Sequence, residues 1–108
     1  MNNKVLQGLP VCGGTAAGRV RIVTDVSHIN QVEYGDILVI PNSHPRYAMG
    51  IMKAGGVICQ EGGRLSHICI VALEMGVPCI TQAENAVEIM KNKEQIFLDA
   101  DKGVVYDA

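Results

Sequence analysis

The chain has 108 residues, of which 48% are apolar and 19% are charged, the size and composition of a single folded domain. Its formal net charge is −2, its nine Lys and Arg are dispersed, and it contains one Phe and no Trp. This argues against nucleic acid or an acidic membrane surface as a partner. No apolar run approaches the roughly 18 residues that cross a bilayer, and the N-terminus lacks a signal-peptide pattern. We therefore expect a cytoplasmic protein that does not associate with membranes.

The four cysteines fit a reducing compartment. Cys12, Cys59, Cys69 and Cys79 form no Cys-x-x-Cys pair, and three of them sit among aliphatic residues, which favours buried free thiols over disulfides. A zinc site built from Cys59, His67 and Cys69 is a weaker alternative, because His and Cys two residues apart match no common zinc-ligand spacing. The sequence therefore predicts no metal bound by this domain.

The first half of the chain predicts short strands and one short helix. The glycine-rich residues 8–18 predict a turn region, and the alternation over residues 19–23 is typical of a half-buried strand. The apolar run at 37–40, which ends at a proline, predicts a buried strand. Residues 43–56 carry a cap candidate, an early proline and exit glycines, which indicates a short helix; residues 56–60 form another strand.

The strongest helix signal covers residues 66–75. Ser66 is a plausible N-cap, and Leu65 before it could pack on Ile70 as a hydrophobic staple. Gly76 provides the left-handed residue that commonly ends a helix. We therefore expect a helix with a sharp beginning and a sharp end.

The last third of the chain predicts a strand at 77–81, a short amphipathic helix at 84–92 and a closing hairpin at 95–107 with its turn at 101–103. Strands and helices alternate through the middle, and strands pair at both ends. The chain therefore predicts an α/β fold with a mixed β-sheet and short helices, closer to a three-layer sandwich than to a barrel.

His67 stands where a cap residue or a hydrophobe would serve. Gly62 and Gly63 leave the backbone bare before the predicted helix, whose first N–H groups carry a partial positive charge that attracts anions. A histidine there is expected to stay neutral and available as a nucleophile. Arg64 adds a permanent cation and Ser66 a hydroxyl, both suited to phosphate oxygens. The segment predicts a nucleophile surrounded by an anion cradle.

Three other interpretations remain open from the residues alone. His67 could be a solvated or capping side chain, or a general base. The segment could also bind an anion in a regulatory module that performs no chemistry. A Cys–His hydrolytic pair of Cys69 and His67 is disfavoured, because side chains two residues apart near a helix start point to different faces.

The same segment resembles the phosphohistidine signature of the phosphoenolpyruvate-utilising enzymes, a family that includes phosphoenolpyruvate synthase, pyruvate phosphate dikinase and enzyme I of the sugar phosphotransferase system. The residues that carry the resemblance are Glu61, Gly62, Gly63, Ser66, His67, Ile70, Ala72, Glu74, Gly76, Val77 and Pro78. The similarity extends outward to "GLPVCGGTAAGRVRIV", "GDILVIPNSHP" and "DADKGVVYDA". It therefore covers nearly the whole chain.

The resemblance implies a swivelling phosphohistidine domain with a β/β/α sandwich. In such enzymes the histidine accepts a phosphoryl group from phosphoenolpyruvate or ATP at one active site and delivers it at another. Carried over, His67 is the nucleophile, while Arg64, Ser66, Gly63 and Ser43 are phosphate-binding candidates. The implied partners are a nucleotide-binding ATP-grasp domain and a phosphoenolpyruvate- or pyruvate-binding domain. Mg²⁺ is expected in those partner domains, and no cofactor is expected in this one.

The chain is too short to hold those partner domains and contains no Walker-type loop. We therefore expect residues 1–108 to form one phosphohistidine domain of a larger phosphotransferase, and not a complete enzyme. Three positions depart from the family pattern: His44 for Asp, Leu73 for Arg and Gln82 for Gly. Such positions line the docking surface in the resembled enzymes, so the identity of the reaction partner stays open.

Overall fold

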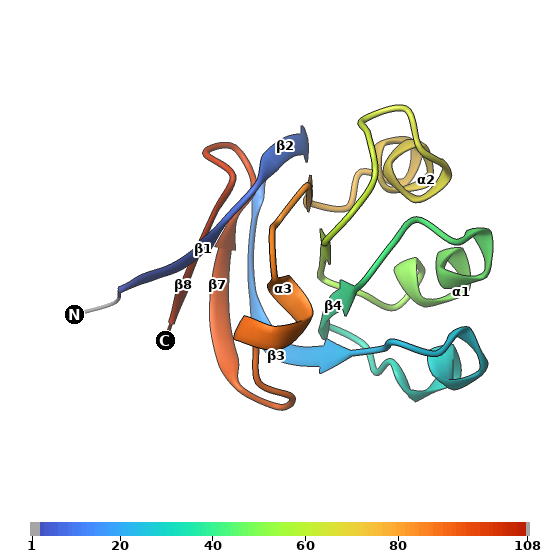
Figure 1. The fold of residues 1–108 in the computed structure, drawn as a ribbon, viewed down its shortest axis with the longest axis horizontal. Helices are drawn as coiled ribbons and strands as arrows, with labels where there is room; N and C mark the ends of the chain where they lie inside the picture. Colours follow the sequence, from blue (N-terminus) through green and yellow to red (C-terminus); the bar gives the residue numbers. More distant parts are fainter. Residues whose placement is uncertain (1–2, 108) are drawn as a thin grey trace.

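The computed structural model describes residues 3–107 (Figure 1). Their strands are hydrogen-bonded in one continuous order, so that each strand pairs with its neighbours. The strands are β1 (Lys4–Gln7), β2 (Leu9–Cys12), β3 (Thr15–Ile22), β4 (Ile37–Ile40), β5 (Gly56–Cys59), β6 (Cys79–Thr81), β7 (Gln95–Asp99) and β8 (Val104–Asp107). The helices are α1 (Ala48–Ile51), α2 (His67–Met75) and α3 (Ala86–Ile89), with 3₁₀ turns η1 (Val26–Gln31) and η2 (Pro45–Tyr47).

The strands follow the order β1-β8-β7-β3-β4-β5-β6-β2, and the sheet is mixed. Strands β3, β4, β5 and β6 run parallel, whereas the pairs β1–β8, β7–β8, β3–β7 and β2–β6 are antiparallel. Strand β3 is shared between two layers: its first half pairs with β7 and its last three residues pair with β4. The β/β/α sandwich is thereby confirmed, since β1, β7 and β8 form one layer, β4 to β6 the middle layer, and α1 and α2 the third (Figure 1).

Burial along β4 explains why its sequence is a continuous apolar run. Ile37 and Val39 belong to the core between the two sheet layers, whereas Leu38 and Ile40 belong to the core between the middle layer and the helices. All four side chains are fully buried. A strand covered on both faces has no solvent side on which to place polar residues, and so loses the alternating pattern.

The two outer edges of the strand order are joined by a single residue, Gly8. Strand β1 pairs with β8 at one end of the order and β2 pairs with β6 at the other. The N–H of Gly8 donates to the carbonyl oxygen of Gly103 at 2.8 Å. A Cβ at Gly8 would lie 2.6 Å from the carbonyl oxygen of Thr81, so the crossing requires glycine.

Several expectations about local structure are corrected. The region 8–18 is not only a turn, because β2 and the first half of β3 lie within it. Strand β1 and turn η1 were not predicted, and the helix expected in 43–56 is a 3₁₀ turn followed by the four-residue α1. The closing hairpin is confirmed: Asp99 pairs with Val104, and Gly103 has a φ of 73° in the turn. In residues 3–107 no helix is long and apolar enough to span a membrane.

Candidate functional site

The loop before α2 is fastened to the middle sheet layer, and this places His67. The N–H of Glu61 donates to the carbonyl of Pro41 at 3.2 Å, and the Thr81 hydroxyl donates to the carbonyl of Gly62 at 2.8 Å. Gly62 has a φ of 140°, and a Cβ there would lie 3.3 Å from the Cβ of Ser43. Position 62 therefore requires glycine, both because of its positive φ and because a side chain would be crowded against Ser43.

Gly63 plays a different part from Gly62. Its φ does not lie in the left-handed region, and a Cβ added to it would meet no atom within 4 Å. Its carbonyl oxygen accepts hydrogen bonds from the N–H of Ser66 at 3.0 Å and from the Ser66 hydroxyl at 2.7 Å. Gly63 is exposed and leaves open space beside the helix start, as a site for an incoming anion would require.

The helix expected at 66–75 is confirmed as α2, but its side-chain cap comes from elsewhere in the chain. Ser66 occupies the N-cap position with extended backbone, yet its hydroxyl makes no bond to the helix. The hydroxyl of Ser43, in the β4–η2 loop, accepts the N–H of Ile68 at 2.9 Å. The expected staple is wrong, because Leu65 is 86% exposed. Gly76 ends the helix with a φ of 70°, as predicted.

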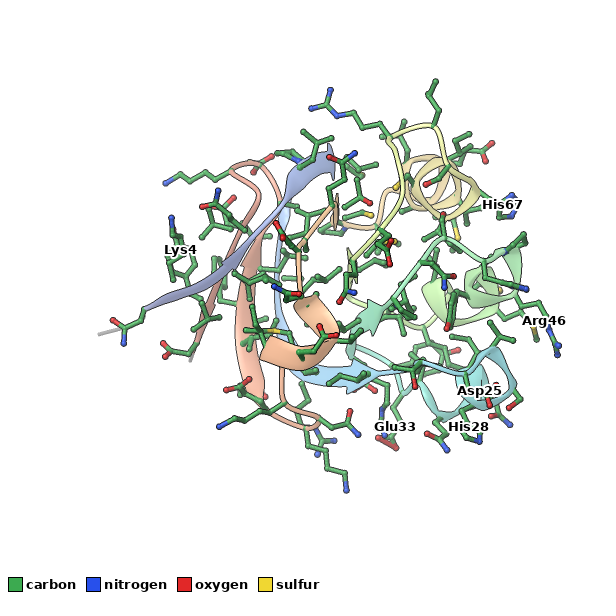
Figure 2. All side chains as sticks on the ribbon, in the orientation of Figure 1. Lys4, Asp25, His28, Glu33, Arg46 and His67 are labelled. Carbon is green, nitrogen blue, oxygen red and sulfur yellow. The ribbon has the colours of Figure 1, made fainter. Side chains whose placement is uncertain are left out.

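His67 is the first residue of α2 and is exposed. Figure 2 shows its imidazole at the outer edge of the helical layer, on the same side of the molecule as Arg46. The backbone N–H groups of His67 and Cys69 have no acceptor among residues 3–107, while that of Ile68 is taken by Ser43. Cys69 is fully buried, so the first turn of α2 presents the free N–H of His67 beside its exposed imidazole.

Arg64 is exposed, and only one of its guanidinium nitrogens makes a hydrogen bond within residues 3–107. Its Nε donates to the carbonyl of Pro10 in β2 at 3.1 Å. This bond holds the Nε end of the Arg64 guanidinium against β2, at the edge of the middle layer. The two terminal nitrogens of Arg64 have no bond partner in the described part of the chain. Its role as a phosphate ligand stays a prediction, as do the phosphate-binding roles of Ser43, Gly63 and Ser66.

His44 lies in the loop that also supplies Ser43. Its Nδ1 accepts the N–H of Arg46 at 3.1 Å, which caps η2, and its ring meets that of Tyr47 edge-on with centroids 6.3 Å apart. Tyr47 is buried, and this burial raises the pKa of its hydroxyl. His44 is thus an exposed turn residue that caps η2.

The cysteine expectations hold for the described residues. Cys59, Cys69 and Cys79 are buried free thiols, and Cys12 is half-buried. In residues 3–107 no group of three metal-binding side chains is arranged to hold an ion, which leaves the zinc alternative unsupported. Cys69 is buried in the core beneath α2 whereas His67 is exposed, so the two do not form a hydrolytic pair.

Two shallow grooves lie elsewhere on the surface. One of about 720 Å³ follows β1 and the start of α3, and another of about 550 Å³ adjoins it. They share the lining residues Gln82, Glu84 and Asn85, and His67 lines neither. His67 therefore projects from the surface instead of sitting in either groove.

Comparison with known proteins places this arrangement in a family. The sequence model described as "PEP-utilising enzyme, mobile domain" matches residues 32–103, about two thirds of the chain. The chain belongs to that family. The match includes the whole segment that positions His67, from the Ser43 loop through α2 to Gly76.

Full-length relatives of the mobile domain are much longer than this chain. It is 34% identical over 103 residues to a probable phosphoenolpyruvate synthase of Methanothermobacter thermautotrophicus, covering 95% of this chain and 15% of that protein. It is 36% identical over 102 residues to the phosphoenolpyruvate synthase of Pyrococcus furiosus, covering 94% of this chain and 12% of that protein. The chain therefore spans only about an eighth of the length of these relatives.

Solved structures of differently named proteins share this fold. The solution structure of Enzyme I (nEIt) aligns with a TM-score of 0.61 at 20% identity, over 71% of this chain and 32% of that one. The holo-form of Thermococcus kodakaraensis aconitase X aligns with a TM-score of 0.70 at 18% identity, over 95% of this chain and 97% of that one. At these identities the likeness shows the fold alone, so function must be argued from the site.

Proposed function

We propose that this mobile domain carries a phosphoryl group on His67, which it receives from phosphoenolpyruvate or ATP at one active site and delivers at another. One observation supports the proposal above the others: His67 is an exposed imidazole on the first turn of α2, whose start is capped by Ser43, and its own backbone N–H has no acceptor among residues 3–107. That N–H group and the helix dipole favour the negative charge of a phosphoryl group.

The projecting position of His67 suits a carrier. A side chain that must enter two active sites has to stand clear of its own domain, because the donor and the acceptor each bring their own cations and binding groups. His67 lines neither of the two grooves. Next to it, α2 exposes Ile70 and Leu73, whose side chains provide apolar surface for contact with another domain.

The chemistry is a pair of displacements at phosphorus. A ring nitrogen of His67 that carries no hydrogen attacks the phosphorus, a P–N bond forms, and the P–O bond to the leaving enolate or nucleotide oxygen breaks. In the second site a nucleophile attacks the same phosphorus, the P–N bond breaks, and the neutral imidazole is restored. Ser43, Ser66, Gly63 and the terminal nitrogens of Arg64 would stabilise the phosphoryl oxygens, since phosphoryl transfer asks the protein mainly for positioning and charge stabilisation.

The length of the relatives supports a role beside further domains. The chain spans 12–15% of the phosphoenolpyruvate synthases that it matches, so those proteins contain further domains. We assign the donor and acceptor sites to a nucleotide-binding ATP-grasp domain and a phosphoenolpyruvate- or pyruvate-binding domain. The Mg²⁺ that neutralises the transferring phosphates would be held by those domains.

The test uses a small phosphoryl donor, so that no partner domain is needed. The chain is incubated with phosphoramidate and the label on each histidine is followed by peptide mapping. The three histidines are all exposed, so His28 and His44 serve as internal controls for reactivity without the cradle. We expect acid-labile, base-stable phosphate to accumulate on His67 first, and His67→Ala to remove that fast phase.

Equal labelling of all three histidines would show that the start of α2 gives no advantage and would contradict the proposal. A phosphate-dependent shift of the His67 resonances without any covalent label would instead favour the anion-binding or regulatory module. The physiological donor is then identified with the full-length protein, by comparing labelling from phosphoenolpyruvate with labelling from ATP.

A further inference from the structure

Two cysteines from distant parts of the chain face each other across one pair of strands. Cys12 at the end of β2 and Cys79 at the start of β6 are directly opposite in the antiparallel β2–β6 ladder. Both side chains lie on the same face of the middle layer, because Cys79 belongs to the core between that layer and the helices and Cys12 packs against this core. The register of the two strands therefore places the two side chains next to each other.

The other two cysteines of the chain have no partner of this kind. Strands β5 and β6 pair Val57 with Cys79, so Cys59 lies two residues further along β5 and is not opposite Cys79. Cys69 belongs to α2 and therefore to the helical layer, outside every strand pair. Of the four cysteines, only Cys12 and Cys79 are brought together by strand register.

The spacing of such a pair is close to that of a disulfide. Directly opposite residues in an antiparallel pair have Cβ atoms about 4.5–5.5 Å apart, and a disulfide brings them to about 3.5–4.5 Å, so an approach of about 1 Å is needed. Strand β2 is the last strand of the order and is hydrogen-bonded on one side only. Between Pro10 and Cys12 it has one residue more than β6, and a strand bends readily at such a bulge. The edge strand can therefore supply this movement.

The two thiols differ in their access to solvent. Cys12 is half-buried, whereas Cys79 is fully buried. An oxidant dissolved in water therefore meets Cys12 first, and Cys79 is the thiol opposite it. The Cys79 thiol makes one long hydrogen bond, of 3.8 Å to the carbonyl of Ile80. Because a thiol is a weak donor, turning the Cys79 side chain toward β2 loses little.

We propose that Cys12 and Cys79 are a reversible thiol oxidation site, which hydrogen peroxide converts into a cross-strand disulfide between β2 and β6. The Cys12 sulfur attacks the peroxide as a thiolate, an S–O bond forms, the O–O bond breaks, and the departing hydroxide takes up the Cys12 proton as water. The Cys79 sulfur then attacks the Cys12 sulfur, an S–S bond forms, the S–O bond breaks, and the second hydroxide leaves with the Cys79 proton as water. The two thiols lose two electrons, which reduce the peroxide.

The disulfide would act on the phosphoryl site through Arg64, a consequence that rests on the proposed function. The carbonyl of Pro10, two residues before Cys12 on β2, accepts the Nε–H of Arg64 at 3.1 Å. Drawing Cys12 toward Cys79 bends β2 at the bulge, so the Pro10 carbonyl and the guanidinium that it holds move relative to α2. Because phosphoryl transfer depends on the position of the binding groups, we expect the oxidised protein to accept phosphate on His67 about tenfold more slowly.

The site is tested by treating the reduced chain with hydrogen peroxide, blocking the remaining thiols and mapping disulfide-linked peptides by mass spectrometry. We expect a Cys12–Cys79 linkage that a dithiol reverses. Cys59→Ala and Cys69→Ala should leave this linkage in place, while Cys12→Ser should abolish it. The parent chain gives the linkage directly, so the result does not depend on whether a core variant folds. A linkage of Cys79 to Cys59 or Cys69, or a Cys12–Cys12 linkage between two chains, would overturn the assignment.

The order of the two steps gives a second readout. In Cys79→Ala the first step can occur and the second cannot, so a sulfenic acid should accumulate on Cys12 and be captured by a 1,3-dione added with the peroxide. In the parent chain the same reagent should capture much less, because Cys79 consumes the sulfenic acid. Capture on Cys59 or Cys69 instead of Cys12 would contradict the entry of the oxidant at the half-buried thiol.

The effect on the phosphoryl site is measured by labelling the oxidised and the reduced chain with phosphoramidate. We expect slower labelling of His67 in the oxidised parent, and the same rate before and after peroxide in Cys12→Ser, which cannot form the linkage. Equal rates for the oxidised and reduced parent would contradict the coupling through Arg64. If the disulfide forms but the reduced protein takes no phosphate on His67, the proposed function fails and the oxidation site stands.

Discussion

Replacing Ser43 with alanine tests how the start of α2 is held. The Ser43 hydroxyl accepts the N–H of Ile68 at 2.9 Å across 25 residues of sequence, and it is the side chain that caps this helix. Alanine keeps the Cβ that packs beside Gly62 and removes only the hydroxyl. Loss of such a cap costs about 1 kcal/mol of the free energy of unfolding. For a chain of this length that corresponds to a melting temperature lower by about 4 °C.

The measurement is urea denaturation of matched serine variants, followed by circular dichroism. Ser43→Thr keeps an acceptor hydroxyl and should recover most of the stability. Ser66→Ala removes only the bond to the Gly63 carbonyl and should cost less than Ser43→Ala. Ser27→Ala changes an exposed hydroxyl bound to Asp25, remote from α2, and should stay within about 0.5 kcal/mol. If Ser66→Ala costs more than Ser43→Ala, the local residue is the cap and the assignment is wrong.

Three further predictions concern the framework around the site. Gly18→Ala should destabilise the chain by about 1–3 kcal/mol or more, because its Cβ would collide with the Gly35 carbonyl oxygen, whereas Gly63→Ala should stay within about 0.5 kcal/mol; equal melting temperatures would contradict this. Gln82→Gly should stabilise the chain by about 1 kcal/mol, since Gln82 has a φ of 53°, and a fall in melting temperature would refute the strain argument. Asp36→Asn should cost about 1.5–3 kcal/mol in urea denaturation, because its buried carboxylate accepts Arg21 Nε at 2.9 Å and the Glu33 N–H at 3.0 Å. Arg19→Gln, which removes only an exposed 3.9 Å pair, should cost less than about 1 kcal/mol; equal costs would show that burial does not strengthen the Asp36 contacts.

Local signals were sufficient for the elements that depend on near neighbours. Gly76 and the apolar positions before it predicted where α2 ends, and the turn at 101–103 predicted the closing hairpin. The unbroken run at 37–40 predicted a buried strand, and the structure shows that β4 is covered by a core on each face. The resemblance of the residues around His67 also indicated the family, which the comparisons confirm.

The elements that were missed depend on distant partners. Strand β1 pairs with β8 at the other end of the chain, and β2 pairs with β6 and contains Pro10. Each has four residues and no alternation of buried and exposed positions that the sequence could reveal. Their strand character comes from hydrogen bonds that form only after the two sheet layers have met, since a short strand has little intrinsic preference.

The candidate site likewise has features that local sequence predicted and features that depend on distant contacts. The sequence by itself determined that a histidine would stand at the start of a helix behind two glycines, because caps, glycines and apolar spacing act over a few residues. Only the tertiary structure decided that Ser43 caps that helix and that Arg64 reaches Pro10. It likewise decided that Cys59, Cys69 and Cys79 share one buried core, against which Cys12 packs. The contacts of Ile68 with Ser43, of Arg64 with Pro10 and of Cys79 with Cys12 join residues 25 to 67 positions apart. No local sequence preference encodes such contacts, because they form only when the three layers pack together.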